Sequence, residues 1–211
     1  MVRYGKEHKQ ATRQRIIETA GRRFKQDGID GSGVAILMAD AGLTNGAFYA
    51  HFESKDDLVT TVVADQLHSQ DAAVSAMAPG RAGVEEFVRE YLSVQHRDDP
   101  ADGCPSAALL DEIARSTDPT KQAYTDGLLA VIDDVTTRLA PRNPASARAQ
   151  ALSVFAQMVG TLQLSRALVD RSLADQVLEQ GLQNALTLLG AVQQKPRSTR
   201  ARPARATTRR T

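Results

Sequence analysis

The stretch GLTNGAFYAHFESKDDL concentrates side chains that can recognise nucleic acid. Asn45 and Tyr49 carry an amide and a phenol, which can hydrogen-bond to base edges, while His51 and Lys55 can donate to phosphate oxygens. Gly46 is small, so the backbone beside it can approach another surface closely. A helix that enters the major groove of duplex DNA needs this combination of small residues and hydrogen-bonding groups.

Short helices separated by tight turns must position these side chains. Apolar residues at helical spacing predict four N-terminal helices, at residues 9–26, 34–41, 45–52 and 55–76. Gly42 separates the second helix from the third and permits the tight turn of a helix-turn-helix. Phe48 and Phe52 lie four residues apart, so we expect them to pack on the first helix while Tyr49 points away. The alternative for Tyr49, His51 and Lys55 is that they complete a small three-helix core.

Residues 9–58 resemble the DNA-binding domain of the TetR family of bacterial transcriptional regulators. The resemblance depends on an ordered set of positions: Ile17, Ala20, Phe24, Gly28, Ser32, Val34, Ala39, Ala41, Gly42, Leu43, Thr44, Gly46, Phe48, Tyr49, His51, Phe52, Ser54, Lys55 and Leu58. This chain departs from the family pattern at Met38, where alanine is usual, and at Gly33, where serine or threonine is common.

The resemblance implies roles for individual residues. It places Asn45, Gly46, Tyr49 and Ala50 at bases, and Thr44, His51, Lys55, Ser32, Gly33 and Val34 at or beside phosphates. Arg13 and Arg15, on the first helix, are further candidates for phosphate contact.

The rest of the chain also has helical spacing, so we predict an all-α fold. Further helices are expected at 84–97, 106–116, 120–139, 145–169 and 173–193, with Pro or Gly at the breaks between them. The predicted domains are a helix-turn-helix DNA-binding domain at 1–55, a helical ligand-binding and dimerisation domain at 56–194, which begins with a connecting helix at 56–76, and a basic disordered tail at 195–211.

Charge is distributed unevenly along the chain. Residues 1–55 carry a net charge of +3, residues 56–194 carry −9, and the tail has seven basic residues and no acidic one. Basic ends around an acidic middle indicate a polyanionic partner at the ends. The tail either adds sequence-independent phosphate contacts or is a solubilising end.

Two of the last helices carry apolar residues on more than one face. This pattern predicts a four-helix interface between two copies of the chain, formed by Phe155, Val159, Leu162, Leu178, Leu182 and Leu186. The alternative is a thicker core within one chain. A dimer would also pair two DNA-binding heads, as operators with two half-sites require.

An effector pocket is harder to locate from the sequence. A mostly apolar cavity with a few polar groups is expected from Tyr91, Gln95, Leu110, Ile113, Tyr124, Leu128, Gln157 and Met158, although each of them can equally be ordinary packing. Cys104 precedes Pro105 at a helix start, where the helix dipole can favour a thiolate, so either redox sensing or a capping and packing role is open.

These patterns favour a ligand-responsive DNA-binding regulator over an enzyme. Paired carboxylates such as Asp98-Asp99 and Asp133-Asp134 are adjacent in sequence and diverge by about 100° on a helix, so neither pair can converge on a substrate. We expect no cofactor and no metal site, a homodimer on a palindromic DNA operator, release by a small organic effector, and a cytoplasmic location without a membrane span. Repression is the usual mode that the family resemblance implies. An architectural DNA-binding protein with little sequence specificity is the alternative.

Overall fold

The computed structural model describes the backbone of residues 2–190 and the side chains of residues 6–190. Over this range the chain forms helices and no strand, which confirms the all-α prediction. The elements in chain order are α1 (Val2–Asp27), α2 (Val34–Asp40), the 3-10 helix η1 (Asn45–Ala50), α3 (Lys55–Ala76), α4 (Arg81–Tyr91), α5 (Val94–Asp98), α6 (Pro105–Arg115), α7 (Asp118–Leu139), the 3-10 helix η2 (Pro144–Ala147), α8 (Arg148–Ala167) and α9 (Arg171–Leu188). The predicted basic tail lies outside the described residues.

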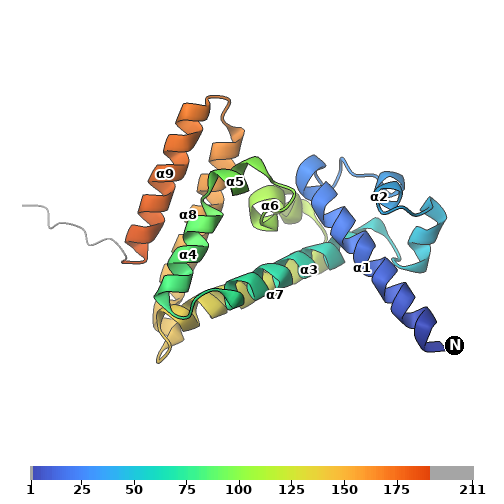
Figure 1. Ribbon diagram of the computed structural model, residues 1–211, viewed down its shortest axis with the longest axis horizontal. Coiled ribbons are helices and arrows are strands. Elements are labelled where there is room, and N and C mark those ends of the chain that lie inside the picture. Colours follow the sequence, from blue (N-terminus) through green and yellow to red (C-terminus); the bar gives the residue numbers. More distant parts are fainter. Residues whose placement is uncertain (1, 191–211) are drawn as a thin grey trace, which may run out of the picture.

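Figure 1 shows α1, α2 and η1 gathered at one end of the molecule and α8 and α9 at the other, with α3 and α7 running between them. We call the first group the head and everything from α4 onward the body. The helix predicted at residues 55–76 is confirmed as α3, with bounds at Lys55 and Ala76. Its N-terminus is fixed by Ser54, whose side chain accepts a hydrogen bond from Asp57 N.

Several elements differ from the prediction: α1 begins at Val2 instead of residue 9, and the 3-10 helix η2 precedes α8. Two further differences have local reasons. The third helix of the head is a short 3-10 helix, in which Ala47 N bonds to Thr44 O three residues earlier. The single helix expected at 84–97 is two helices, α4 and α5. The break occurs at Ser93, whose side chain accepts from His96 N and caps a new helix.

The head is built around a core that includes part of the body. Phe48 and Phe52 are only 1% and 2% exposed, which confirms that both pack inward. The same cluster contains Leu109 and Ile113 of α6. The expected boundary at residue 55 stays a prediction, because this core crosses it.

Polar contacts add to the junction between the head and α6. Glu112 Oε1 accepts hydrogen bonds from Ile29 N at 2.8 Å and from Asp30 N at 3.3 Å. These two amides follow Gly28, whose φ of +82° turns the chain after α1. A shift of α6 must therefore move or strain the turn between α1 and α2.

The head is joined to the rest of the molecule by α3, which packs closely against α7. A Cβ added at Gly127 of α7 would lie 2.5 Å from Leu67 Cβ on α3, closer than two carbon atoms can pack, and Leu67 is completely buried. We therefore expect Gly127→Ala to push the two helices apart and to lower the free energy of unfolding by about 1–3 kcal/mol, as overpacking does.

Urea unfolding followed by circular dichroism measures this loss. Thr125→Ala is the matched control, because Thr125 is exposed on the same helix, and its effect should stay within about 0.5 kcal/mol. Equal stability of the two variants would contradict close packing at Gly127.

Candidate nucleic-acid interface

One face of the head carries most of the residues predicted to meet DNA. The exposed ones are Gly33, Thr44, Asn45, Gly46, Tyr49 and Ala50, and Val34 and His51 are half-buried. Tyr49 is 73% exposed, although its ring meets the buried Phe48 ring edge-on at a centroid distance of 5.3 Å. Phe48 thus anchors η1 while its neighbour in sequence is held outward. The DNA contacts themselves stay predictions.

Ile36 is a further exposed residue of the head that the predicted set did not include. It is 44% exposed and lies on α2, whose inward positions are Leu37 and Met38. The sequence carried a signal for Ile36, because this residue is not among the positions of α2 that the helical spacing places inside. An isoleucine outside that set is exposed to solvent or to a partner.

Two residues predicted to contact phosphate form hydrogen bonds within the chain, and their phosphate contacts stay predictions. Ser32 is completely buried, and its hydroxyl donates to Gly28 O at 2.8 Å. Lys55 Nζ donates to Ile29 O at 2.5 Å in a partly buried setting. Both side chains hold the turn between α1 and α2 and so help to shape the face.

A cationic group flanks η1 at the N-terminal part of α1. The guanidinium of Arg13 lies 4.7 Å from the centroid of the Phe52 ring, and its Nη2 donates to Thr61 Oγ1 at 3.3 Å. Burial lowers the pKa of His51 below 6.5, and the positive charges of Lys9 and Arg13 lower it further. Lys9 therefore lies within electrostatic reach of the recognition face, although sequence reasoning did not select it.

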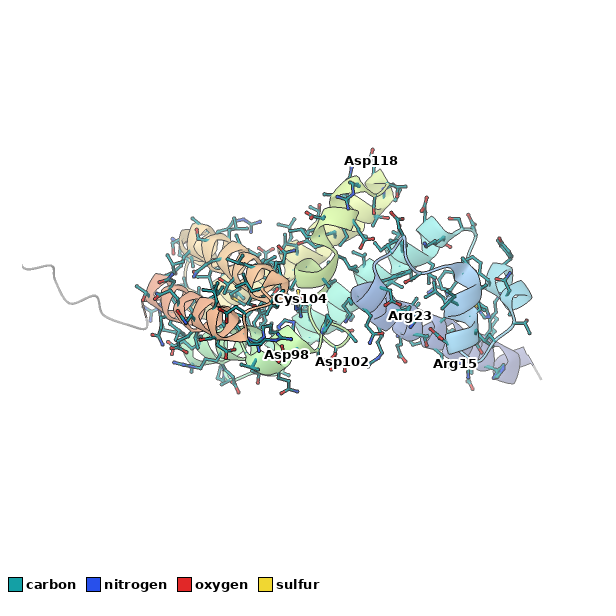
Figure 2. The ribbon with its side chains drawn as sticks, turned by 90° about the horizontal axis from the view of Figure 1, so that it is seen from above. Arg15, Arg23, Asp98, Asp102, Cys104 and Asp118 are labelled. Carbon is teal, nitrogen blue, oxygen red and sulfur yellow. The ribbon has the colours of Figure 1, made fainter. Side chains whose placement is uncertain are left out.

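Two further polar features fit a phosphate-facing surface. His51 Nδ1 is buried without a hydrogen-bond partner. Arg15 is exposed on the same helix as Arg13 and is labelled in Figure 2. A duplex phosphate placed beside η1 would meet several hydrogen-bond donors and positive charges.

The eight residues predicted to line an effector pocket do not all come together. Tyr91, Leu110, Leu128 and Met158 belong to or pack on the core of the body, whereas Ile113 and Tyr124 belong to or pack on the core of the head. Gln95 is exposed to solvent, and Gln157 lines an outer groove. Gln95 and Gln157 thus lie apart from the four residues of the body core, and their role in effector binding stays a prediction.

The predicted dimer residues also need correction. Phe155, Val159, Leu162, Leu178 and Leu186 are buried in the core of the body within one chain, and Leu182 packs against that core. Side chains that are already buried have little surface left to place against a second copy. The outer face of α8 and α9 instead carries Leu152, Leu164, Leu173 and Leu188, each at least 43% exposed.

A groove of about 680 Å³ runs between α8 and α9 on this outer side. It is lined by Gln157, Thr161, Gln176, Val177, Glu179, Gln180, Gly181 and Asn184. Mixed polar and apolar lining is common at surfaces that other proteins cover.

Among residues whose structure is described, no helix is long and apolar enough to cross a membrane. The same part of the chain has no group of three or more His, Cys, Asp or Glu side chains placed to hold a metal ion.

The sequence of the head matches known proteins. Residues 16–62 match the profile of bacterial regulatory proteins of the tetR family. The HTH-type transcriptional regulator TtgR of Pseudomonas putida is 44% identical over 68 residues, which is 32% of each chain. The HTH-type transcriptional repressor AcnR of Corynebacterium diphtheriae is 33% identical over 87 residues, or 41% of this chain and 43% of AcnR. The aligned segments thus span well under half of these relatives.

The fold of the whole chain matches solved structures at low sequence identity. The reduced form of Escherichia coli NemR superposes with a TM-score of 0.70 and 18% identity, covering 84% of this chain and 96% of NemR. The regulator FadR of Bacillus subtilis, in complex with stearoyl-CoA, superposes with a TM-score of 0.58 and 15% identity, covering 80% of this chain and 97% of FadR. Residues 16–62 thus match the tetR family of bacterial regulatory proteins in sequence, and the chain as a whole shares the fold of these solved structures.

Proposed function

We propose that this protein is a DNA-binding transcriptional regulator, and that it represses transcription by occupying a palindromic operator as a homodimer. The observation that supports this most is the exposed face of η1, where Asn45, Gly46 and Tyr49 point outward from a head that matches a family of DNA-binding regulators. Repression is further supported by the similarity to AcnR, which is named a repressor.

The outer face of α8 and α9 is our candidate for the dimer interface. It lies at the end of the molecule opposite the head (Figure 1). Two copies joined there by a two-fold axis would leave both heads free to reach successive half-sites on the same side of a duplex. Exposed leucines on both helices, among them Leu164 and Leu188, supply apolar surface for such an interface.

The effector, in this proposal, is a small and largely apolar organic molecule bound in the body. FadR, a protein of the same fold, is described in complex with stearoyl-CoA. Tyr91, Leu110, Leu128 and Met158 share one apolar cluster in this chain, and opening of that cluster would disturb α6 and α7. Because α6 also packs into the core of the head, effector binding can favour a different placement of the heads. Effector binding should weaken DNA binding by about 1–3 kcal/mol, the usual size of the coupling free energy between two sites.

Footprinting on the DNA upstream of the gene for this protein tests the proposal directly. We expect protection of two half-sites with dyad symmetry, at a salt concentration where random DNA is not protected. Candidate small molecules should weaken the protection. Equal affinity for operator and random DNA would instead favour an architectural protein with little specificity.

The proposed phosphate contact of His51 predicts a pH dependence. In the free protein its pKa lies below 6.5 because of burial and because of Lys9 and Arg13. A bound phosphate offsets these positive charges and raises that pKa, so DNA binding takes up a proton. Operator affinity should therefore increase as the pH falls through the window around 6.5, and should lose this dependence in His51→Gln.

Fluorescence anisotropy with a labelled operator, measured at constant ionic strength from about pH 5.5 to about pH 8, would check this. This range spans the ordinary histidine pKa of about 6.5. A pH dependence that is the same in His51→Gln would assign it to another group.

A further inference from the structure

Cys104 lies in a polar cluster at the centre of the molecule, outside the proposed DNA and dimer surfaces. Figure 2 shows it between the head, marked by Arg23, and the pair of helices α8 and α9. The thiol is 7% exposed, and Sγ donates to Gln70 Oε1 over 3.1 Å. The backbone N of Cys104 donates to His96 Nε2 over 2.9 Å. The thiol is thus held in one place by groups from α3 and α5.

His96 fixes this arrangement in its neutral form. Nε2 accepts from Cys104 N, so the ring proton is on Nδ1, which donates to Tyr91 O over 2.8 Å. Burial lowers the pKa of His96 and favours this neutral ring. The imidazole therefore ties the Cys104 loop to the end of α4.

The hydroxyl of Tyr91 is the unusual feature of the cluster. Tyr91 is 4% exposed, and its Oη has no hydrogen-bond partner. Its ring stands edge-on to His96 at a centroid distance of 4.7 Å. Burial raises the pKa of this hydroxyl, and the next largest cause is the neighbouring Cys104. A buried O–H without an acceptor costs free energy, so an oxygen atom placed on the sulfur would give it a partner.

Lys25 of α1 supplies a base on the same side. Its Nζ donates to Gly103 O over 2.8 Å. Burial lowers the pKa of Lys25 to about 8, even though Cys104 acts to raise it. Some of this amine is therefore neutral near pH 7 and can accept the thiol proton. A thiolate formed at Cys104 would also face the cationic side chain of Arg166, whose pKa burial lowers and Tyr91 and Cys104 raise.

We propose that Cys104 is a site of reversible oxidation by hydroperoxides, with Tyr91 stabilising the sulfenic acid that forms. Lys25 takes the thiol proton, and the thiolate sulfur attacks one peroxide oxygen. The S–O bond forms as the O–O bond breaks. The sulfur loses two electrons, the peroxide is reduced, and the departing oxygen takes up the proton from Lys25 to give water or an alcohol. The Tyr91 hydroxyl then donates to the new oxygen, and the sulfenic O–H can donate to Gln70 Oε1.

Oxidation of Cys104 would affect the head through the two residues that precede Cys104 in the chain. Gly103 O accepts from Lys25, and Asp102 forms an ion pair with Arg22, so two consecutive residues of this loop hold α1. An added oxygen in so tightly packed a place must move the loop or its neighbours. This second step rests on the proposed function, because it predicts weaker operator binding after oxidation.

The chemistry is tested separately from DNA binding. The full-length protein is treated with hydrogen peroxide, trapped with dimedone and analysed by peptide mass spectrometry. We expect Cys104 to be labelled at least about tenfold faster than the same cysteine in a synthetic peptide of residues 99–110, since reactivity follows the local environment of the thiol. An equal rate in protein and peptide would overturn the proposal.

Two variants assign the roles of the neighbours. Tyr91→Phe keeps the ring and removes the donor, so the sulfenic acid should form but persist for a several-fold shorter time. Lys25→Arg keeps the positive charge and removes the base, so oxidation should slow. An unchanged lifetime in Tyr91→Phe contradicts the role of the hydroxyl, and Cys104→Ser provides the unlabelled control.

Operator binding by the oxidised protein tests the coupling. A several-fold fall in affinity that thiol reductant reverses, and that is absent in Cys104→Ser, supports it. Oxidation without any change in operator affinity overturns the coupling while leaving the thiol site intact. Failure of the reduced protein to bind any duplex would instead overturn the proposed function. The labelling result does not depend on DNA, so the two failures can be told apart.

Discussion

Replacing Tyr49 by alanine should remove much of the preference for operator over random DNA without unfolding the protein. The side chain is 73% exposed, so its loss leaves the core of the head unchanged, and stability should change by no more than about 0.5 kcal/mol. A contact to a base edge is typically worth about 1–3 kcal/mol of discrimination, which corresponds to about a 5- to 150-fold loss in the affinity ratio. Parallel titrations of operator and random duplex at one salt concentration measure that ratio.

The neighbouring residue provides the matched contrast. Phe48 is 1% exposed and stacks on Phe52 with centroids 5.7 Å apart, so Phe48→Ala should destabilise the protein by about 3–5 kcal/mol. Tyr49→Phe retains the ring and tests the hydroxyl alone. If Tyr49→Ala instead unfolds the protein, or leaves the affinity ratio unchanged, the assignment of η1 as the recognition element is wrong.

The sequence was most informative where a pattern depends on a single helix. The bounds of α3, the inward direction of Phe48 and Phe52, and the outward direction of Tyr49 all agree with helical spacing near Gly42. These features follow from local geometry, because side chains three or four residues apart share a face and neighbouring ones do not.

The sequence was less informative where a polar side chain hydrogen-bonds to a carbonyl group elsewhere in the fold. Ser32 and Lys55 are residue types that commonly bind phosphate, but here they donate to Gly28 O and Ile29 O. The carbonyl of Ile29 is 26 positions from Lys55 in sequence. Only the tertiary structure brings these atoms together, so residue type and family position alone could not predict these hydrogen bonds.

The dimer residues were missed for a related reason. Helical periodicity shows that α8 has apolar residues on several faces, but it does not distinguish the face that meets α9 and α4 from the face left exposed. Phe155 and Leu162 belong to the inner face, and Leu152 and Leu164 to the outer one. The meeting of Lys25, Tyr91 and Cys104 is likewise a property of the fold, since they come from α1, α4 and the start of α6.

Placing a charge on the outer face should separate the proposed dimer. Leu164 is 54% exposed on α8, and in a two-fold interface built from α8 and α9 it would be buried against the second copy. In Leu164→Glu the carboxylate must lose water without gaining a partner. We expect a cost of at least about 3 kcal/mol, which weakens dimerisation by about 100-fold or more.

Analytical ultracentrifugation across protein concentrations measures this effect, and operator titration should show a parallel loss because one head alone contacts only half of a palindrome. Leu129→Glu is the control: Leu129 is 36% exposed on α7, outside the proposed interface, and the same charge there should leave both measurements unchanged. If Leu164→Glu remains dimeric while Leu129→Glu does not, the interface must be moved from α8 and α9 to the surface of α7. The heads would then be paired from a different part of the body, and the spacing of the operator half-sites would change with it.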